Sequence, residues 1–170
     1  NNKVLFVEAD IRSPSVLNSF YKFDKEIYGL GEIISSKIAF KDTLFTVPGT
    51  KLKIITSGAK RFDMSDIVNK EQIKKFFDIL KMEYDYLIID SPPVQPVSDT
   101  LILTQAADHN LFIIRSDSSK TLAFMSSMKK IQNVGAKIDG IVINDLDTSK
   151  DSYYNYNYNY NYSSKYYNKA

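Results

Sequence analysis

The sequence predicts an α/β fold with a mainly parallel sheet, and three observations support this prediction. Five short runs of mainly Val, Ile, Leu and Phe recur along the chain, with the composition of strands that are covered on both faces. Stretches with helical periodicity separate most of these runs, and strands that alternate with helices pair in parallel. Each run ends in polar or acidic residues, as expected at the ligand-binding rim of an open parallel sheet.

The predicted strands follow directly from the apolar runs. Each run contains four to six apolar residues, too few for a buried helix of ordinary length. A polar or charged residue closes each run, which marks the exit of the strand into a loop. The five predicted strand regions are residues 3–10, 51–58, 85–92, 110–117 and 138–146.

Three helices are predicted between the strands. The clearest covers residues 69–84, because Ile73, Phe76, Phe77 and Leu80 follow the spacing of one buried helix face. A second helix is predicted over residues 13–22, which start with a Ser-Pro pair suited to an N-cap and a first helical position. A third is predicted over residues 119–135, where a terminal glycine is a plausible C′ residue.

Composition narrows the class of function. The 170 residues carry a net charge of +2 and include no cysteine, so disulfides and thiolate chemistry are excluded. The near-neutral charge gives no electrostatic case for nucleic-acid binding. No apolar run reaches the roughly 18–20 residues that a membrane-spanning helix needs. The chain starts without methionine and almost directly on an apolar run, which predicts that it is part of a larger protein.

Acidic residues at the ends of two predicted strands are the main candidates for chemistry. Glu8 and Asp10 follow the first run, Arg12 comes next, and Asp90 ends the third run. An acid at a strand end beside a phosphate site is the usual way in which a phosphoryl-transfer enzyme holds magnesium, and arginine binds phosphate or carboxylate. The alternative is that the acids only cap the helices that follow.

These stretches resemble a known family. The sequence "VLFVEADIRSP" is similar to the Walker A′ motif, and "YDYLIIDSPPV" to the Walker B motif, of the bacterial protein-tyrosine kinases of capsule and exopolysaccharide production. The resemblance extends from residue 3 to about residue 147 and includes "GLGEIISSKIAFKDTLF", "IITSG" and "DGIVIND". It implies a three-layer P-loop NTPase-like sandwich, shared with the MinD and ParA ATPases, with ATP and Mg²⁺ as cofactors.

The resemblance also implies roles for individual residues. Glu8 corresponds to the base that accepts the tyrosine proton, although the family usually carries aspartate there. Asp10 corresponds to the second acid near the metal and the phosphates, and Arg12 to the basic residue that follows. Asp90 corresponds to the Walker B magnesium ligand. Asn144 corresponds to a position that contacts adenine in related ATPases.

The phosphate-binding loop of the family does not occur in this sequence. No G-x-x-x-x-G-K-[ST] pattern is present, and the family pattern predicts it upstream of Asn1, so we expect the 170 residues alone not to bind ATP competently. An inactive, degenerate homologue is the alternative. The predicted organisation is a kinase domain over residues 1–147, lacking the first strand, the P-loop and the following helix, and a flexible tyrosine-rich tail over residues 148–170.

The tail predicts the phosphate acceptors. It lacks the aliphatic side chains needed to offset ordering entropy, so we expect it to be disordered and able to enter the active site of a neighbouring subunit. A prion-like low-complexity segment is the alternative. The predicted acceptors are Tyr153, Tyr154, Tyr156, Tyr158, Tyr160, Tyr162, Tyr166 and Tyr167.

The resemblance finally implies partners and a setting. These are a membrane activator or chain-length (Wzz-like) protein, fused or separate, a homo-oligomeric ring, and a cognate tyrosine phosphatase, with the kinase at the cytoplasmic face of the cell membrane. Two alternatives are a MinD/ParA-like ATPase switch and a non-enzymatic interaction module phosphorylated by another kinase.

Overall fold

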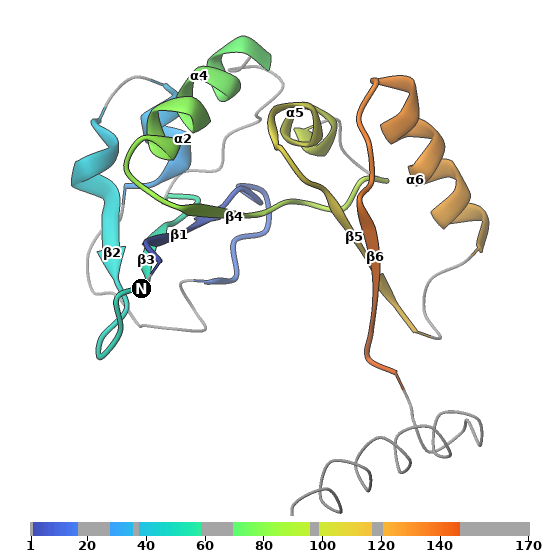
Figure 1. Ribbon diagram of the computed structural model, residues 1–170, viewed down its shortest axis with the longest axis horizontal. Coiled ribbons are helices and arrows are strands. Elements are labelled where there is room, and N and C mark those ends of the chain that lie inside the picture. Colours follow the sequence, from blue (N-terminus) through green and yellow to red (C-terminus); the bar gives the residue numbers. More distant parts are fainter. Residues whose placement is uncertain are drawn as a thin grey trace, which may run out of the picture.

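The computed structural model describes residues 2–16, 28–35, 38–58, 70–95, 99–116 and 121–146. Within these segments strands and helices alternate along most of the chain (Figure 1). No helix in the described segments is long and apolar enough to span a membrane. The elements are β1 (Val4–Glu8), α2 (Leu30–Ile34), the 3-10 helix η1 (Phe40–Thr43), β2 (Leu44–Thr46), β3 (Lys53–Ile55), α4 (Lys70–Lys81), β4 (Tyr86–Asp90), α5 (Asp99–Ala106), β5 (Leu111–Arg115), α6 (Thr121–Asn133) and β6 (Gly140–Asn144).

The described strands form two sheets. The first has the order β2-β3-β1-β4, and the second pairs β5 with β6. All pairings are parallel except that of β2 with β3, which confirms the predicted α/β fold with a mainly parallel sheet. Among the described residues β4 pairs only with β1 and β5 only with β6, so each strand has one unpaired edge.

Helices α4 and α5 cover one face of the first sheet. Leu5 and Val7 of β1 point to this face and are fully buried. Ile73 and Phe77 of α4 and Leu103 of α5 pack into the same core cluster. Helix α5 lies between α4 on one side and α6 on the other (Figure 1).

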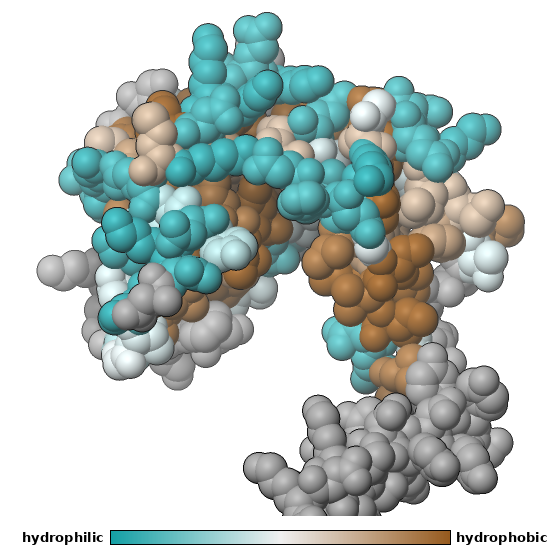
Figure 2. Space-filling view, in the orientation of Figure 1, coloured by the Kyte–Doolittle hydropathy of each residue, from teal (hydrophilic) through white to brown (hydrophobic). Residues whose placement is uncertain are grey.

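Helix α6 covers the same side of the second sheet that α5 covers of the first. The Phe112 ring of β5 meets the Phe124 ring of α6 edge-on, with ring centroids 5.5 Å apart. The opposite face is exposed. There Tyr86 and Ile88 of β4, and Leu111 and Ile113 of β5, are 57%, 53%, 67% and 66% exposed. Figure 2 shows the apolar surface over β5 and β6.

The exposed face corrects the prediction that every strand is covered on both faces. The apolar runs of β4, β5 and β6 are suited to double burial, but the described helices α4, α5 and α6 lie on one side only. The second helical layer of the predicted three-layer sandwich is therefore not among the described residues.

The predicted elements otherwise agree with the structure. All five predicted strand regions contain a strand, and the predicted helices over 69–84 and 119–135 are α4 and α6. Gly135 follows α6 with a φ of +73°, the left-handed conformation expected of a C′ residue. Most of the predicted helix over residues 13–22 lies outside the described residues.

Four described elements were named by no prediction: α2, η1, β2 and α5. Strand β2 has only three residues and pairs antiparallel at the edge of the sheet, so it is too short to show an alternating pattern. Helix α5 lacks a polar face from which helical periodicity could be recognised.

Candidate active site

Two acidic residues end neighbouring parallel strands at the same edge of the first sheet. Glu8 is the last residue of β1 and Asp90 the last residue of β4, and the strand register pairs them directly. The backbone N–H of Ala9 donates a hydrogen bond to the Asp90 carbonyl oxygen at 2.8 Å, which keeps the strands together past their ends. Because residues paired in a parallel sheet point to the same face, both side chains project on the same side.

Asp10 follows Glu8 by two residues, so a third carboxylate belongs to the same edge of the sheet. Partial burial raises the pKa of the Asp90 carboxyl above its ordinary value, and the negative charges of Glu8 and then Asp10 raise the pKa further. A divalent cation bound there would relieve this repulsion. The donor set fits Mg²⁺, which prefers one or two carboxylates completed by water and phosphate oxygens.

The protein ligands alone do not enclose a metal. Within the described segments no group of three or more His, Cys, Asp or Glu side chains could hold a metal ion.

The carboxylate of Glu8 is turned toward backbone amides. Its side chain is fully buried. Oε1 accepts hydrogen bonds from the N–H groups of Ser15 and Val16, both at 2.7 Å. Oε2 accepts one from the N–H of Ser57, just beyond β3, at 3.0 Å. Glu8 therefore connects the segment after β1 to the end of β3.

Asp10 and Arg12 lie in the segment after β1. Asp10 Oδ1 accepts hydrogen bonds from the backbone N–H groups of Arg12 and Ser13, at 3.2 and 3.0 Å. These bonds, together with those of Glu8 to Ser15 and Val16, are the contacts that the capping interpretation of the two acids requires. The structure thus contains both the capping contacts and the clustering of the acids with Asp90.

Arg12 is paired with Asp99, a residue that the sequence analysis did not select. Arg12 Nε donates a hydrogen bond to Asp99 Oδ2 at 3.0 Å. The Asp99 side chain is 1% exposed while that of Arg12 is 37% exposed, so the guanidinium retains access to solvent. Asp99 Oδ1 is buried and has no hydrogen-bond partner within the described part of the chain. The only sequence signal for Asp99 is an acid at the start of a helix after a proline-containing loop.

Asn144 lies on the other sheet. It ends β6 and pairs in register with Arg115 at the end of β5, and its carbonyl oxygen accepts the N–H of Ser116 at 2.8 Å. Its side chain is exposed and makes no hydrogen bond to the carboxylates in the described residues. The structure therefore brings together Glu8, Asp10 and Asp90, with Arg12 beside them, but does not join Asn144 to them.

The predicted phosphate acceptors, Tyr153 to Tyr167, lie outside the described residues.

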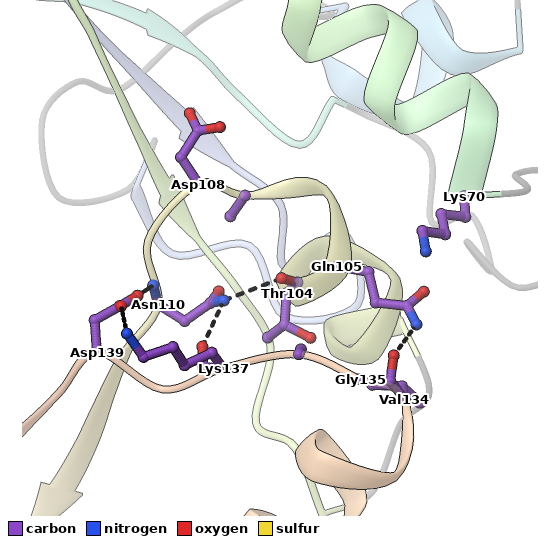
Figure 3. A pocket seen from close by; sticks show the side chains of 11 residues that line it. Lys70, Thr104, Gln105, Asp108, Asn110, Val134, Gly135, Lys137 and Asp139 are labelled. Atoms are coloured by element: carbon purple, nitrogen blue, oxygen red, sulfur yellow. Dashed lines mark hydrogen bonds and ion pairs between the residues drawn. The ribbon is translucent and has the colours of Figure 1, made fainter.

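A cavity of about 210 Å³ lies away from the carboxylate cluster, where α5 and α6 end and β5 and β6 begin (Figure 3). Its polar side chains largely satisfy one another: Asn110 donates to the carbonyl oxygens of Thr104 and Lys137, and Asp139 pairs with Lys137. None of the predicted site residues lines this cavity.

Comparison with known proteins finds similarity to named tyrosine-protein kinases. No family model matches the chain. The tyrosine-protein kinase ptk of Acinetobacter johnsonii is 29% identical over 155 residues, which are 90% of this chain and 21% of that protein. The tyrosine-protein kinase CpsD of Streptococcus pneumoniae is 26% identical over 154 residues, 91% of this chain and 67% of that protein.

This chain is similar to the bacterial tyrosine-protein kinases. Solved kinase domains share its fold: the VpsO kinase domain has a TM-score of 0.77 at 22% identity and covers 86% of this chain, which in turn covers 71% of that domain. MinD of Pyrococcus horikoshii, determined as a complex with Mg-ADP, has a TM-score of 0.65 at 17% identity over 84% of this chain and 57% of MinD. The chain thus has the fold shared by these kinases and the MinD-type ATPases, and it spans about a fifth to two thirds of the curated kinases compared here.

Proposed function

We propose that this chain is the catalytic part of an ATP-dependent tyrosine autokinase. It transfers the γ-phosphoryl group of ATP to tyrosines in the C-terminal segment of a neighbouring subunit. The observation that carries this proposal is the meeting of acids at one edge of the sheet: Glu8 pairs in register with Asp90, and Asp10 follows Glu8 by two residues. The similarity to named tyrosine-protein kinases supports the same activity.

The residues of the cluster would have different roles in the transfer. Asp90 would hold Mg²⁺, which neutralises charge on the phosphate oxygens during transfer. A carboxylate of the cluster accepts the proton of the tyrosine hydroxyl, whose ordinary pKa of about 10 leaves it protonated at neutral pH. Arg12, oriented by Asp99, presents its exposed guanidinium edge to a phosphate.

We further propose that the phosphate-binding loop is carried by a strand paired between β4 and β5. The facing edges of these two strands are unpaired within the described residues. The apolar side chains of Ile88 and Ile113 beside those edges are exposed, and a parallel strand followed by a helix would cover them. Backbone amides of such a loop hold the nucleotide phosphates, so residues 1–147 need this strand for ATP binding.

The tail supplies the acceptors in this proposal. Tyrosines alternate with asparagines over most of residues 153–162, which offers many equivalent acceptors without one fixed register. Each phosphate adds about −1.5 to −2 charges, so eight sites would bring roughly −12 to −16. Repulsion between such tails would drive the subunits of a ring apart, and a membrane-bound activator and a phosphatase would set the balance that controls capsule or exopolysaccharide production.

The decisive experiment follows phosphotyrosine on the full-length protein. With Mg²⁺ and ATP the wild type is expected to label its own tail, and replacement of the eight predicted tail tyrosines by phenylalanine to remove the label. Asp90→Asn should reduce the rate at least about a hundredfold, because it removes a metal ligand. Asp139→Asn is the matched control, since Asp139 lies beside β6 and outside the cluster. Unchanged labelling in Asp90→Asn would refute the assignment.

A MinD/ParA-like ATPase switch is the second candidate, because MinD has the same fold. That function predicts ATP hydrolysis that depends on Asp90, with no phosphotyrosine formed. Labelling of the tail only after addition of a cell lysate would instead favour an interaction module modified by another kinase.

A further inference from the structure

The contacts of Glu8 differ from those expected of a catalytic base. Both of its carboxylate oxygens accept backbone hydrogen bonds, from Ser15 and Val16 on one side and from Ser57 on the other. The side chain has no exposed surface. A buried carboxylate with three N–H donors is a well-satisfied acceptor, and a proton donor from another molecule has no route to it.

The bonds of Glu8 hold the segment that carries Asp10 and Arg12. This segment, residues 10–16, leaves β1 and is bound by Glu8 at its far end, and Glu8 also binds Ser57, which follows β3 and is 49 positions away in sequence. At its near end the Arg12 side chain is fixed to Asp99 on α5. The segment is therefore anchored to β1, β3 and α5 at once.

Asp10 is better placed to receive a proton. Its side chain is only partly buried. Oδ1 accepts the two N–H bonds from Arg12 and Ser13, and Oδ2 makes no hydrogen bond within the described residues. Asp10 also lies close enough to Asp90 to raise the pKa of the Asp90 carboxyl.

We infer that Glu8 is a positioning residue for phosphoryl transfer, which holds residues 10–16 against β3, and that Asp10 is the base. This inference rests on the proposed kinase function. In the transfer step the tyrosine oxygen bonds to the γ-phosphorus as its proton passes to Asp10 Oδ2. The bond between the γ-phosphorus and the bridging oxygen breaks, and its electron pair leaves with ADP.

Two substitutions of Glu8 separate the roles, because they change length and charge independently. Glu8→Gln keeps the length and a carbonyl oxygen that can accept the Ser15 and Val16 bonds, but removes the basic carboxylate. Glu8→Asp keeps the carboxylate but shortens the side chain by one methylene, so that it cannot reach all three amides. If Glu8 is the base, Glu8→Asp should be faster than Glu8→Gln. If Glu8 is a positioning residue, Glu8→Gln should be faster than Glu8→Asp.

The rates are measured as autophosphorylation of the full-length protein at saturating Mg-ATP, at a temperature where every variant is folded. We expect a loss of about tenfold for Glu8→Gln and of about a hundredfold for Glu8→Asp, since a shift of roughly 1 Å in a catalytic group has that effect. Asp10→Asn should abolish transfer.

Hydrogen exchange tests the anchoring without reference to activity. The amides of Ser15, Val16 and Ser57 should exchange at least about tenfold faster in Glu8→Asp than in the wild type. In Glu8→Gln only the Ser57 amide should lose protection. Thr43→Val is the control, because Thr43 is 5% exposed and its hydroxyl donates a hydrogen bond to the Phe40 carbonyl oxygen at 2.8 Å. It should lower stability while leaving the three amides and the rate unchanged.

A Glu8→Asp variant that is faster than Glu8→Gln would overturn the inference. So would a slow Glu8→Asp variant in which all three amides stay protected. A wild type that forms no phosphotyrosine would refute the proposed kinase function instead, and the exchange pattern would then decide alone whether Glu8 anchors the segment.

Discussion

The two sheets are built from similar apolar runs, yet they differ in burial. In β1 the side chains of Leu5 and Val7 are fully buried, whereas in β5 those of Leu111 and Ile113 are about two-thirds exposed. Leu5 and Val7 face α4 and α5, whereas Leu111 and Ile113 face away from the described helices; on that same open face of the first sheet, Ile88 of β4 is 53% exposed. An apolar run therefore predicts a strand, but burial also requires a neighbouring strand and a covering layer.

The difference has a counterpart in the candidate site. The carboxylate cluster belongs to the buried sheet, where the contacts of Glu8 and Asp99 fix its segments. Asn144 belongs to the exposed sheet, where its neighbour Arg115 makes a solvent-exposed ion pair with Asp145. The carboxylate cluster of the candidate site is thus held more firmly than the position predicted to contact adenine.

The largest expected effect compares the same substitution in the two sheets. Ile55→Ala in β3 removes a fully buried side chain and should lower the free energy of unfolding by about 2–5 kcal/mol. Ile113→Ala in β5 removes a side chain that is 66% exposed and should change the free energy by no more than about 0.5 kcal/mol. Urea unfolding of the 170-residue chain measures both. In a full-length protein with a strand between β4 and β5, Ile113→Ala should lower the free energy of unfolding nearly as much as Ile55→Ala does. If the two substitutions lower it equally in the 170-residue chain, the comparison is wrong.

A second pair compares two glycines with positive φ. Gly58, with φ +99°, packs against the Glu32 carboxylate, while Gly135, with φ +73°, has open space around its Cα. Gly135→Ala should cost about 1–2 kcal/mol from backbone strain alone. Gly58→Ala adds a steric conflict with Glu32 and should cost at least about 1 kcal/mol more. Thermal unfolding checks this order, and a smaller loss at Gly58 would show that Glu32 moves freely.

A third pair compares the arginine–carboxylate contacts of the two sheets. Asp99→Ala removes the carboxylate that pairs with the Arg12 guanidinium and should cost about 1–3 kcal/mol, below the loss for a fully buried pair because Arg12 is 37% exposed. Arg115→Ala breaks a 2.7 Å pair whose side chains are 70% and 57% exposed, and should cost no more than about 1 kcal/mol. Salt at 1 M should reduce only the second loss, as measured by urea unfolding with and without salt.

The smallest effects concern pH and have opposite signs in the two regions. The pKa of Asp90 is raised above 3.8 in the folded state, so its ionisation destabilises the fold as pH rises through the raised pKa. Asp90→Asn should therefore raise the melting temperature at neutral pH in the absence of Mg²⁺, and the gain should vanish below pH 3.8.

Asp139 should behave in the opposite way. The backbone N–H of Asn110, followed by Lys137 and His109, lowers the pKa of its carboxyl below 3.8. Its ionised form stabilises the fold above that value, and this contribution is lost as pH falls through the lowered pKa. Asp139→Asn should lower the melting temperature at neutral pH. Shifts of the same sign in Asp90→Asn and Asp139→Asn would contradict the electrostatic difference.

The features that depend on local sequence pattern could be predicted from the sequence. The meeting of Glu8 and Asp90 was predictable because parallel strands end at a common edge. The burial of Glu8 was not, since it depends on the Ser57 amide 49 residues away. The partner of Arg12 is 87 residues away and carries no motif. The exposure of one face of β5 could not be predicted from the sequence, because strands covered on one face and strands covered on both faces can have the same apolar composition.

The unpaired edges of β4 and β5 should also affect the solubility of the chain. Exposed strand edges flanked by apolar side chains are templates for pairing with other molecules. These 170 residues in isolation should accordingly form concentration-dependent aggregates, with β4 and β5 at the contacts between copies. Solubility during expression should therefore show whether β4 and β5 are paired with a further strand.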